Sequence, residues 1–174
     1  METRHLIICK VDKKVKVAQY GQWDGYLTGQ GLTIAEFIQE NLNHEFLLES
    51  YKKKLRNIKF FNKKELDGLD ELTDNLLKAG IAYPPQLSRD TGAEILNIID
   101  NVRQNEFKLV NSIDFGDDDL FCEYSYVLDF DKEILEIYKG GPKKKNIFKK
   151  LKFSEVTTDK IKELDKEMNG EENE

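Results

Sequence analysis

Hydrophobic positions along the chain follow two periods, one typical of strands and one typical of helices. Near the N-terminus, short runs rich in β-branched residues over His5–Val11 and Val15–Tyr20 flank a polar turn and predict a hairpin. Farther along, apolar residues recur every three or four positions, which predicts four helices. These expected helices run from Thr33 to Leu42, from about His44 to Ile58, from about Lys64 to Lys78, and from Thr91 to Val102.

Residues that favour helix ends mark several of these boundaries. Two T-x-x-E sequences, beginning at Thr33 and Thr91, match the capping box that starts a helix. Gly80 is suited to end the third helix, because glycine adopts the left-handed conformation of a C-terminal cap. Pro84-Pro85 then predicts an extended linker.

The second half of the chain returns to the strand period and ends on one more helix. The expected elements are strands over Lys108–Ile113, Leu120–Phe130, Ile134–Tyr138 and Ile147–Phe153, and a helix over Thr158–Met168. The sequence therefore predicts one α+β domain over residues 1–168, followed by a disordered acidic tail over residues 169–174. We expect a single antiparallel sheet, made of the N-terminal hairpin and the C-terminal strands, with four to five helices packed on one face.

Composition narrows the class of protein. The 174 residues are 39% hydrophobic, which is enough for a core, and the net charge of −6 argues against nucleic acid as a partner. No apolar run reaches the roughly 18 residues of a membrane span, and the first residues show no secretory pattern. Cys9 and Cys122 lie in predicted strands and are expected to be buried thiols. We therefore expect a cytoplasmic protein with no membrane partner.

The segment 21–31 is the most informative about function, because four glycines alternate there with aromatic and polar residues. Glycine lets the backbone approach a ligand, and aromatic rings offer flat faces for stacking. The candidate binding residues are Tyr20, just before this segment, and Gln22, Trp23, Asp24, Tyr26 and Gln30 within it. A structural alternative stays open: Asp24-Gly25 is a favoured hairpin turn, with Trp23 and Tyr26 as its flanking pair.

The remaining polar clusters have simpler interpretations. Arg4-His5 is more typical of a structural pair than of a catalytic base. Asp117–Asp119 lacks the spacing of a calcium loop, so we expect a solvated turn and no metal. The lysines between residues 143 and 152 favour a protected strand edge over nucleic-acid binding. No nucleotide-binding, triad or zinc motif occurs, so no cofactor is predicted.

Several of these stretches resemble a family of uncharacterised proteins from phages, bacteria and some fungi. The likeness rests on Thr3–Leu6, Val17–Tyr26, Gly29–Gly31, Leu87–Gly92, Leu120–Asp129 and Leu135–Tyr138. The resemblance supplies no activity, but it implies one cluster of motif residues, namely Arg4, Tyr20, Gln22, Trp23, Asp24, Arg89, Asp90, Glu123 and Tyr124. If the protein is phage-encoded, the host cytoplasm is its expected location.

Three functions fit these observations. The first is a binding protein of phage or mobile-element type that holds a small molecule or a host protein, because aromatic and polar residues gather without a catalytic motif. The second is a hydrolase or transferase resembling the N-terminal-nucleophile enzymes, which requires cleavage after Glu2 to expose Thr3. The third is a structural protein in which the loop packs against a second copy. Binding is favoured over catalysis.

A shared site makes a geometric prediction. The second strand and the strand around Glu123 must then lie in one sheet, with the fourth helix beginning at the end of that sheet. A guanidinium nitrogen of Arg4 or Arg89 is expected within roughly 3 Å of a carboxylate of Asp24, Asp90 or Glu123.

Overall fold

A computed structural model describes residues 2–81, 84–103 and 106–172 of the chain. Its helices and strands follow in the order β1 (Glu2–Val11), β2 (Lys14–Trp23), α1 (Leu32–Asn41), α2 (Glu45–Arg56), β3 (Ile58–Phe60), α3 (Lys63–Lys78), α4 (Ile95–Asn101), β4 (Phe107–Leu109), β5 (Tyr124–Asp129), β6 (Ile134–Tyr138), β7 (Ile147–Lys152) and α5 (Thr158–Glu172). The predicted alternation of strands and helices is confirmed, but the sequence analysis missed β3. The strand expected over Lys108–Ile113 shortens to β4, and the one expected from Leu120 begins only at Tyr124.

The main sheet has five strands in the order β2-β1-β5-β6-β7. Its central pair, β1 and β5, is parallel, and the other neighbours are antiparallel. The prediction of a single antiparallel sheet is therefore wrong on two points. The main sheet contains one parallel pair, β1 and β5, and the strands β3 and β4 form a second, separate sheet that is also parallel. The physical reason lies in β1, where Leu6 to Cys9 are all buried. A strand that is apolar on both faces belongs in the centre of a sheet, where parallel neighbours are common.

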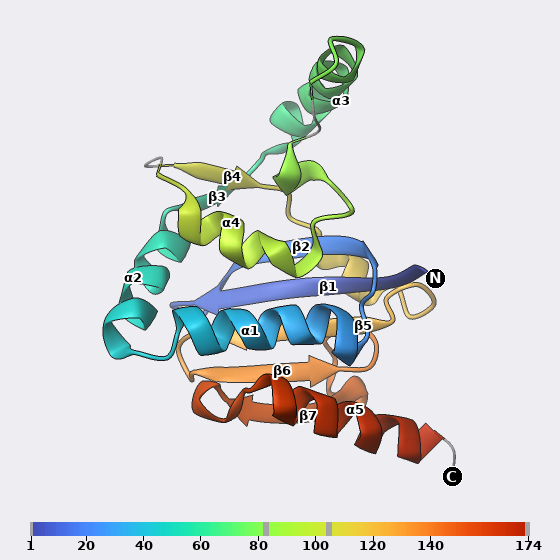
Figure 1. Cartoon of the computed structure of the whole chain (residues 1–174). Coiled ribbons are helices and arrows are strands. Elements are labelled where there is room, and N and C mark those ends of the chain that lie inside the picture. The colour runs from blue at the N-terminus through green and yellow to red at the C-terminus, as the bar shows by residue number, and fades with distance from the viewer. Residues whose placement is uncertain (1, 82–83, 104–105, 173–174) are drawn as a thin grey trace.

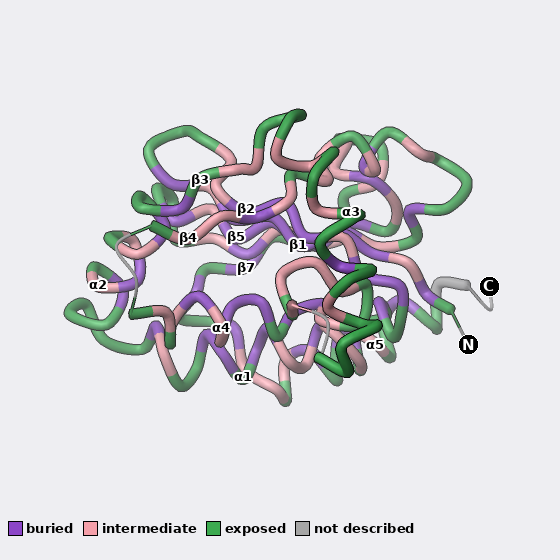
Figure 2. The backbone as a smooth tube through the Cα atoms, turned by 90° about the horizontal axis from the view of Figure 1, so that it is seen from above, coloured by how far each residue is buried: buried purple, intermediate pink, exposed green. Residues whose placement is uncertain are grey.

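Helices cover one face of this sheet, and irregular segments cover the other. Helices α1, α4 and α5 lie side by side over the strands (Figure 1), and their apolar faces meet the main core. Figure 2 shows α1, α4 and α5 on one side of the strands and irregular segments on the other. A smaller buried cluster on that second side includes Leu6, Ile8 and Val127, and Phe115 packs against it. Cys9 belongs to the main core and Cys122 to the smaller cluster, and both are unpaired thiols.

Helix α3 does not pack on the sheet, which corrects the expectation for one of the helices. It projects from the body of the protein (Figure 1), and Thr73 is its one buried residue, although all of α3 is described. Leu72 and Leu77 remain more than half exposed. The end of the helix is as predicted, since Gly80 follows it with a φ of +76°.

Two helices begin differently from the prediction. Helix α1 continues directly from a π-helical turn over Leu27–Gly31, so Thr33 is not a cap. Helix α4 begins after a 3-10 turn, and the Thr91 hydroxyl donates to the carbonyl of Pro85 instead of capping the helix. Neither predicted capping box forms, because α1 has no free first turn at Thr33 and the hydroxyl of Thr91 is bonded to Pro85.

The last helix is longer than predicted. Helix α5 continues to Glu172, so it includes residues 169–172, which the sequence analysis assigned to a disordered tail; residues 173–174 lie outside the described residues. Within the described ranges, no helix combines the length and the apolar character that a membrane crossing requires.

Candidate functional site

Motif stretches that are far apart in the sequence meet at one end of the main sheet, as predicted. Strand β1 begins there, β2 ends there and β5 begins there. The backbone N–H of Gln22 donates to the carbonyl of Arg89 at 2.9 Å, and the indole N–H of Trp23 donates to Asp90 at 2.8 Å. The segment before α4 is therefore bound to the end of β2.

Gln30 joins the same two segments from the other side of the loop. Its side-chain oxygen accepts the backbone N–H of Ala93 at 2.8 Å, at the start of the turn that precedes α4. Its side-chain nitrogen donates to the carbonyl of Trp23 at 3.1 Å. Gln30 is therefore a structural brace of the loop, and it takes the capping role that the sequence suggested for Thr91.

The glycines of the motif leave room for His5. A β-carbon at Gly21 would lie 2.2 Å from Nε2 of His5, and one at Gly25 would lie 2.6 Å from the carbonyl of Thr3. The backbone N–H of Gly25 donates to that same carbonyl at 3.0 Å. These contacts show that Gly21 and Gly25 let the loop fold tightly over the start of β1, which explains both residues without a ligand.

His5 is fully buried beneath this loop. Its Nδ1 lies 3.2 Å from the carbonyl of Thr3, whereas its Nε2 has no hydrogen-bond partner among the described residues. Burial lowers the pKa of His5 to about 4, against weaker opposing effects of the Thr3 carbonyl and of Asp24. The imidazole is therefore neutral near pH 7 and enclosed, which supports the structural interpretation of the Arg4-His5 pair.

Tyr126 anchors the loop from below, and the sequence analysis did not single it out. Its hydroxyl donates to the carbonyl of Gly25 at 2.6 Å, and both residues are buried. A signal for this role was present, because a tyrosine at the centre of a buried strand requires a partner for its hydroxyl.

The loop itself is not the hairpin turn that the alternative interpretation required. Asp24 adopts a φ of +57°, and the chain then enters the π-helical turn Leu27–Gly31 instead of returning as a strand. Trp23 and Tyr26 are accordingly not a cross-strand pair. Their rings are 37% and 38% exposed.

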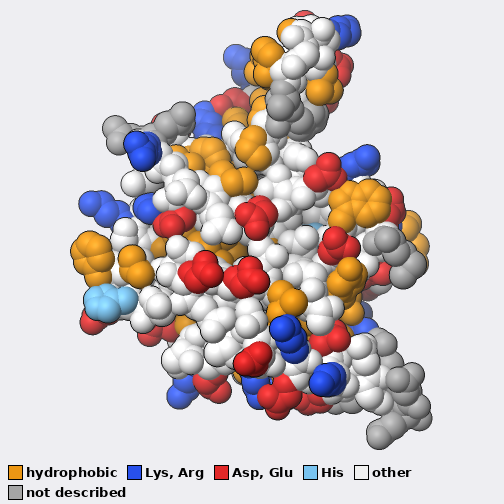
Figure 3. All heavy atoms as spheres, viewed as in Figure 1, with side chains coloured by type: hydrophobic (Ala, Val, Ile, Leu, Met, Phe, Trp, Pro, Cys, Tyr) orange, Lys and Arg blue, Asp and Glu red, His pale blue; other side chains and the backbone are white. Residues whose placement is uncertain are grey.

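Each of these two exposed side chains donates a hydrogen bond to a carboxylate. Trp23 donates to Asp90, and the hydroxyl of Tyr26 donates to Asp24 at 3.0 Å, which raises the pKa of that tyrosine. We call Trp23, Asp24, Tyr26 and Asp90 the aromatic–carboxylate surface. Hydrophobic side chains and carboxylates are interspersed at this end of the molecule (Figure 3).

The arginine prediction is wrong in its detail. The guanidinium of Arg4 pairs with Glu2 at 2.7 Å and lies over the ring of Phe121, 4.9 Å from its centroid. Glu123 is nevertheless a neighbour of Arg4, because its carboxylate accepts the backbone N–H of Arg4 at 2.9 Å. Arg89 is exposed and forms no ion pair within the described part of the chain. Sequence spacing placed these segments together but could not indicate which side chains would meet.

Three other predicted site residues make contacts within the fold. Tyr20 packs edge-on against Phe115 with ring centroids 4.8 Å apart. Gln22 is buried and donates to Glu2. The hydroxyl of Tyr124 donates to the sulfur of Met168 at 3.8 Å. Their roles in the fold account for them.

The polar clusters that were predicted to be structural have structural contacts. Asp118 accepts the backbone N–H groups of Leu120 and Phe121, and Asp119 pairs with Lys143 at 3.2 Å. In the described ranges, no group of histidines, cysteines and carboxylates is arranged to hold a metal ion. Strand β7 lies at the edge of the sheet, and some of its lysines pair with neighbouring glutamates, as Lys149 does with Glu167.

Thr3 lies in a setting that does not suit a nucleophile. It is 8% exposed and sits within β1, and its carbonyl accepts hydrogen bonds from the loop. Glu2, which would have to be cleaved off to expose Thr3 as a nucleophile, bonds to both Arg4 and Gln22.

Comparison of the chain with protein-family models, with curated proteins and with solved structures finds no match.

Proposed function

We propose that this chain is a binding protein that holds a partner protein on its aromatic–carboxylate surface. The observation that carries the proposal is the contrast between the tightly packed residues that hold the loop and the two aromatic residues that the loop exposes. Gly21, Gly25, Gln30 and Tyr126 fix the loop from below, and Trp23 and Tyr26 are left on the surface.

This arrangement is typical of a recognition surface. Exposed tryptophan and tyrosine are the residues that most often anchor protein interfaces. Their hydrogen bonds to Asp90 and Asp24 restrict the rings before binding, so less conformational entropy is lost when a partner arrives. The carboxylates also disfavour the phosphates of nucleic acid.

The finer parts of the proposal rest on the sequence. The resemblance of the motif to phage proteins supports a host protein as the partner. The two unpaired thiols, Cys9 and Cys122, support a reducing compartment such as the cytoplasm.

A photo-crosslinking experiment tests the proposal. p-Benzoylphenylalanine replaces Tyr26 in one variant and Leu72, which is 53% exposed on α3, in a control variant. After irradiation in host lysate, we expect a discrete crosslinked protein only from position 26. The additional substitution Asp90→Asn, which removes the indole's acceptor, is expected to weaken that product.

Two outcomes would contradict the proposal. Identical products from positions 26 and 72, or none from either, would show that the surface has no specific partner. A crosslinked product with the mass of two copies of the chain would instead support self-association through the loop. Light scattering on the wild type and on Trp23→Ala would then show whether the oligomer depends on this surface.

A further inference from the structure

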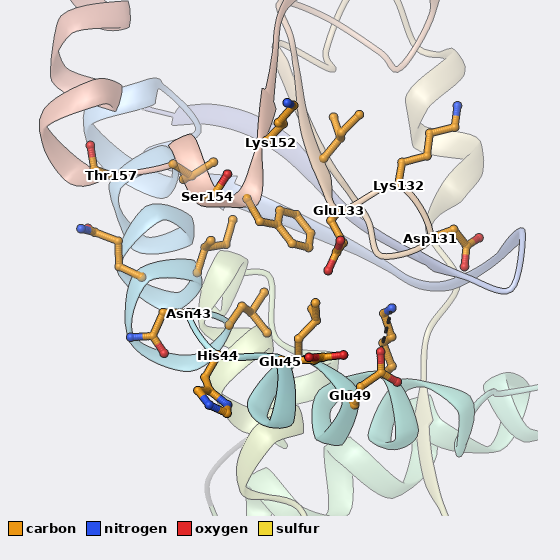
Figure 4. Close-up of a pocket in the computed structure, with 18 residues that line it drawn as sticks. Asn43, His44, Glu45, Glu49, Asp131, Lys132, Glu133, Lys152, Ser154 and Thr157 are labelled. Atoms are coloured by element: carbon orange, nitrogen blue, oxygen red, sulfur yellow. Dashed lines mark hydrogen bonds and ion pairs between the residues drawn. The ribbon is translucent and has the colours of Figure 1, made fainter.

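A groove of about 1070 Å³ lies at the opposite end of the sheet from the aromatic–carboxylate surface. Strand β5 begins beside that surface and ends beside the groove, so the two features are separated by the length of the sheet. The first turns of α2 form one wall (Figure 4). The turn between β5 and β6 and the segment after β7 form the other.

The floor of the groove is apolar. Leu42 and Leu48 reach it from the α1–α2 region, and Phe153 reaches it from the segment after β7. Each of the three is only 6% or 7% exposed, so their packing already fixes the shape of the floor. Ile134 and Val156 extend the same floor.

Three glutamates lie on the inner walls of the groove. Glu133 points from the β5–β6 turn toward α2, where Glu45 and Glu49 lie (Figure 4). The carboxylate of Glu49 is paired with Lys52 at 3.2 Å, whereas Glu45 and Glu133 make no ion pair with any side chain in the described part of the chain.

None of the three lysines that line the groove forms an ion pair with Glu45 or Glu133 in the described part of the chain, and Lys52 pairs with Glu49 instead. Lys132 and Lys152 line the walls, but their side chains point away from the space between the carboxylates (Figure 4). The groove therefore presents negative charge above an apolar floor, although the rim as a whole carries both signs.

We propose that this groove binds a segment of a partner protein in which lysine or arginine alternates with apolar residues. The apolar side chains would lie against Leu42, Leu48 and Phe153, and a cationic head would lie between Glu45 and Glu133. Lysine and arginine suit this environment because their alkyl stems pack on apolar surface while the charged end stays solvated.

The size of the groove favours a polypeptide over a small molecule. Small-molecule sites usually enclose roughly 300–1,000 Å³ and bury most of the ligand. This groove lies at the upper limit of that range, and it is open to solvent along charged walls. A peptide segment can fill such an open groove while its two ends continue outside.

An NMR titration tests the inference with the peptide Lys-Leu-Lys-Leu-Lys as the probe. Saturable shifts are expected at the methyl groups of Leu42, Leu48 and Ile134. The peptides Glu-Leu-Glu-Leu-Glu and Lys-Ser-Lys-Ser-Lys are expected to bind more weakly, because the first reverses the charge and the second removes the apolar side chains. The double variant Glu45→Gln/Glu133→Gln is expected to weaken binding roughly tenfold.

A matched variant and a second ligand make the result decisive. Glu36→Gln/Glu71→Gln removes the same charge from exposed positions outside the groove and is expected to leave binding unchanged. Equal weakening in both double variants would show attraction to net charge alone and would overturn the proposal. So would spermine binding as tightly as the peptide, or the absence of saturable shifts at millimolar peptide.

Discussion

Removal of a single hydroxyl tests whether the motif loop is anchored from beneath. In the wild type, the hydroxyl of Tyr126 donates to the carbonyl of Gly25 at 2.6 Å, and both groups are buried. Tyr126→Phe keeps the ring and its packing but leaves this carbonyl without its donor. An unsatisfied buried polar group costs about 1–3 kcal/mol of stability. For a domain of this size, that loss lowers the melting temperature by roughly 2–12 °C.

Urea denaturation provides the measurement, with circular dichroism reporting on the whole fold. Trp23 is the only tryptophan and lies in the loop itself, so its fluorescence reports on the anchored segment. The control is Tyr124→Phe, two positions earlier in the same strand. Its hydroxyl donates to a weak acceptor, the sulfur of Met168, at 3.8 Å, so the expected loss is below about 0.5 kcal/mol.

The comparison can refute the reasoning in a simple way. If Tyr126→Phe and Tyr124→Phe unfold at the same urea concentration as the wild type, the bond to Gly25 does not hold the loop. If Tyr126→Phe is destabilised and its fluorescence transition precedes the change in circular dichroism, the loop detaches before the sheet unfolds.

Three further predictions concern the same fold. Gly21→Ala places a β-carbon 2.2 Å from Nε2 of His5, so urea denaturation is expected to show a free energy of unfolding lowered by roughly 1–3 kcal/mol. Gly68→Ala, where the new β-carbon meets open space on α3, is expected to raise it by about 0.5–1 kcal/mol. Burial lowers the pKa of His5 from 6.5 to about 4, so between these two pH values the unfolded chain binds a proton at His5 and the folded chain does not. We therefore expect the free energy of unfolding to fall by roughly 3 kcal/mol as the pH is lowered from 6.5 to 4. The variant His5→Gln is expected to flatten this dependence. Burial raises the thiol pKa of both Cys9 and Cys122, so a thiol reagent such as DTNB is expected to react with them only as fast as the protein opens, and fast native-state labelling would contradict this.

Local patterns predicted the elements well wherever local contacts decide them. Ile134–Tyr138 alternates apolar and polar residues and forms β6 with those bounds. His5–Val11 was recognised from its β-branched residues, although β1 begins earlier, at Glu2, because Trp23 at the end of β2 pairs with it. Asn62 forms a capping box with Glu65 at the start of α3, which the T-x-x-E pattern does not include.

Long-range pairing was the part that sequence patterns could not predict. Nothing in the run Leu6 to Cys9 says whether its second neighbour will be parallel, and β5 lies more than a hundred residues later. The motif correctly predicted that segments 21–31 and 88–92 meet. It could not separate residues that hold the loop, such as Gln30 and Gly25, from residues that the loop presents, such as Trp23. That distinction depends on burial, which only the assembled sheet determines.

The groove was invisible in the sequence for a related reason. Its walls come from α2, from the β5–β6 turn and from the segment after β7, and no motif connects them. Glu45 and Glu133 are ordinary exposed glutamates when taken one at a time. Only their placement above Leu42, Leu48 and Phe153 gives them a shared role.

The parallel pairing of β1 with β5 has a consequence for synthesis on the ribosome. The β1–β2 hairpin leaves the ribosome before β5, because the strand that pairs with the other edge of β1 begins 113 residues after β1 ends, at Tyr124. At about 5–20 residues per second, that edge stays uncovered for roughly 6–23 s. Throughout this interval Leu6 to Cys9 offer unpaired backbone groups and apolar side chains to any other nascent chain. Nascent chains that stop before β5 should therefore aggregate or bind chaperones, whereas chains that extend past β6 should not.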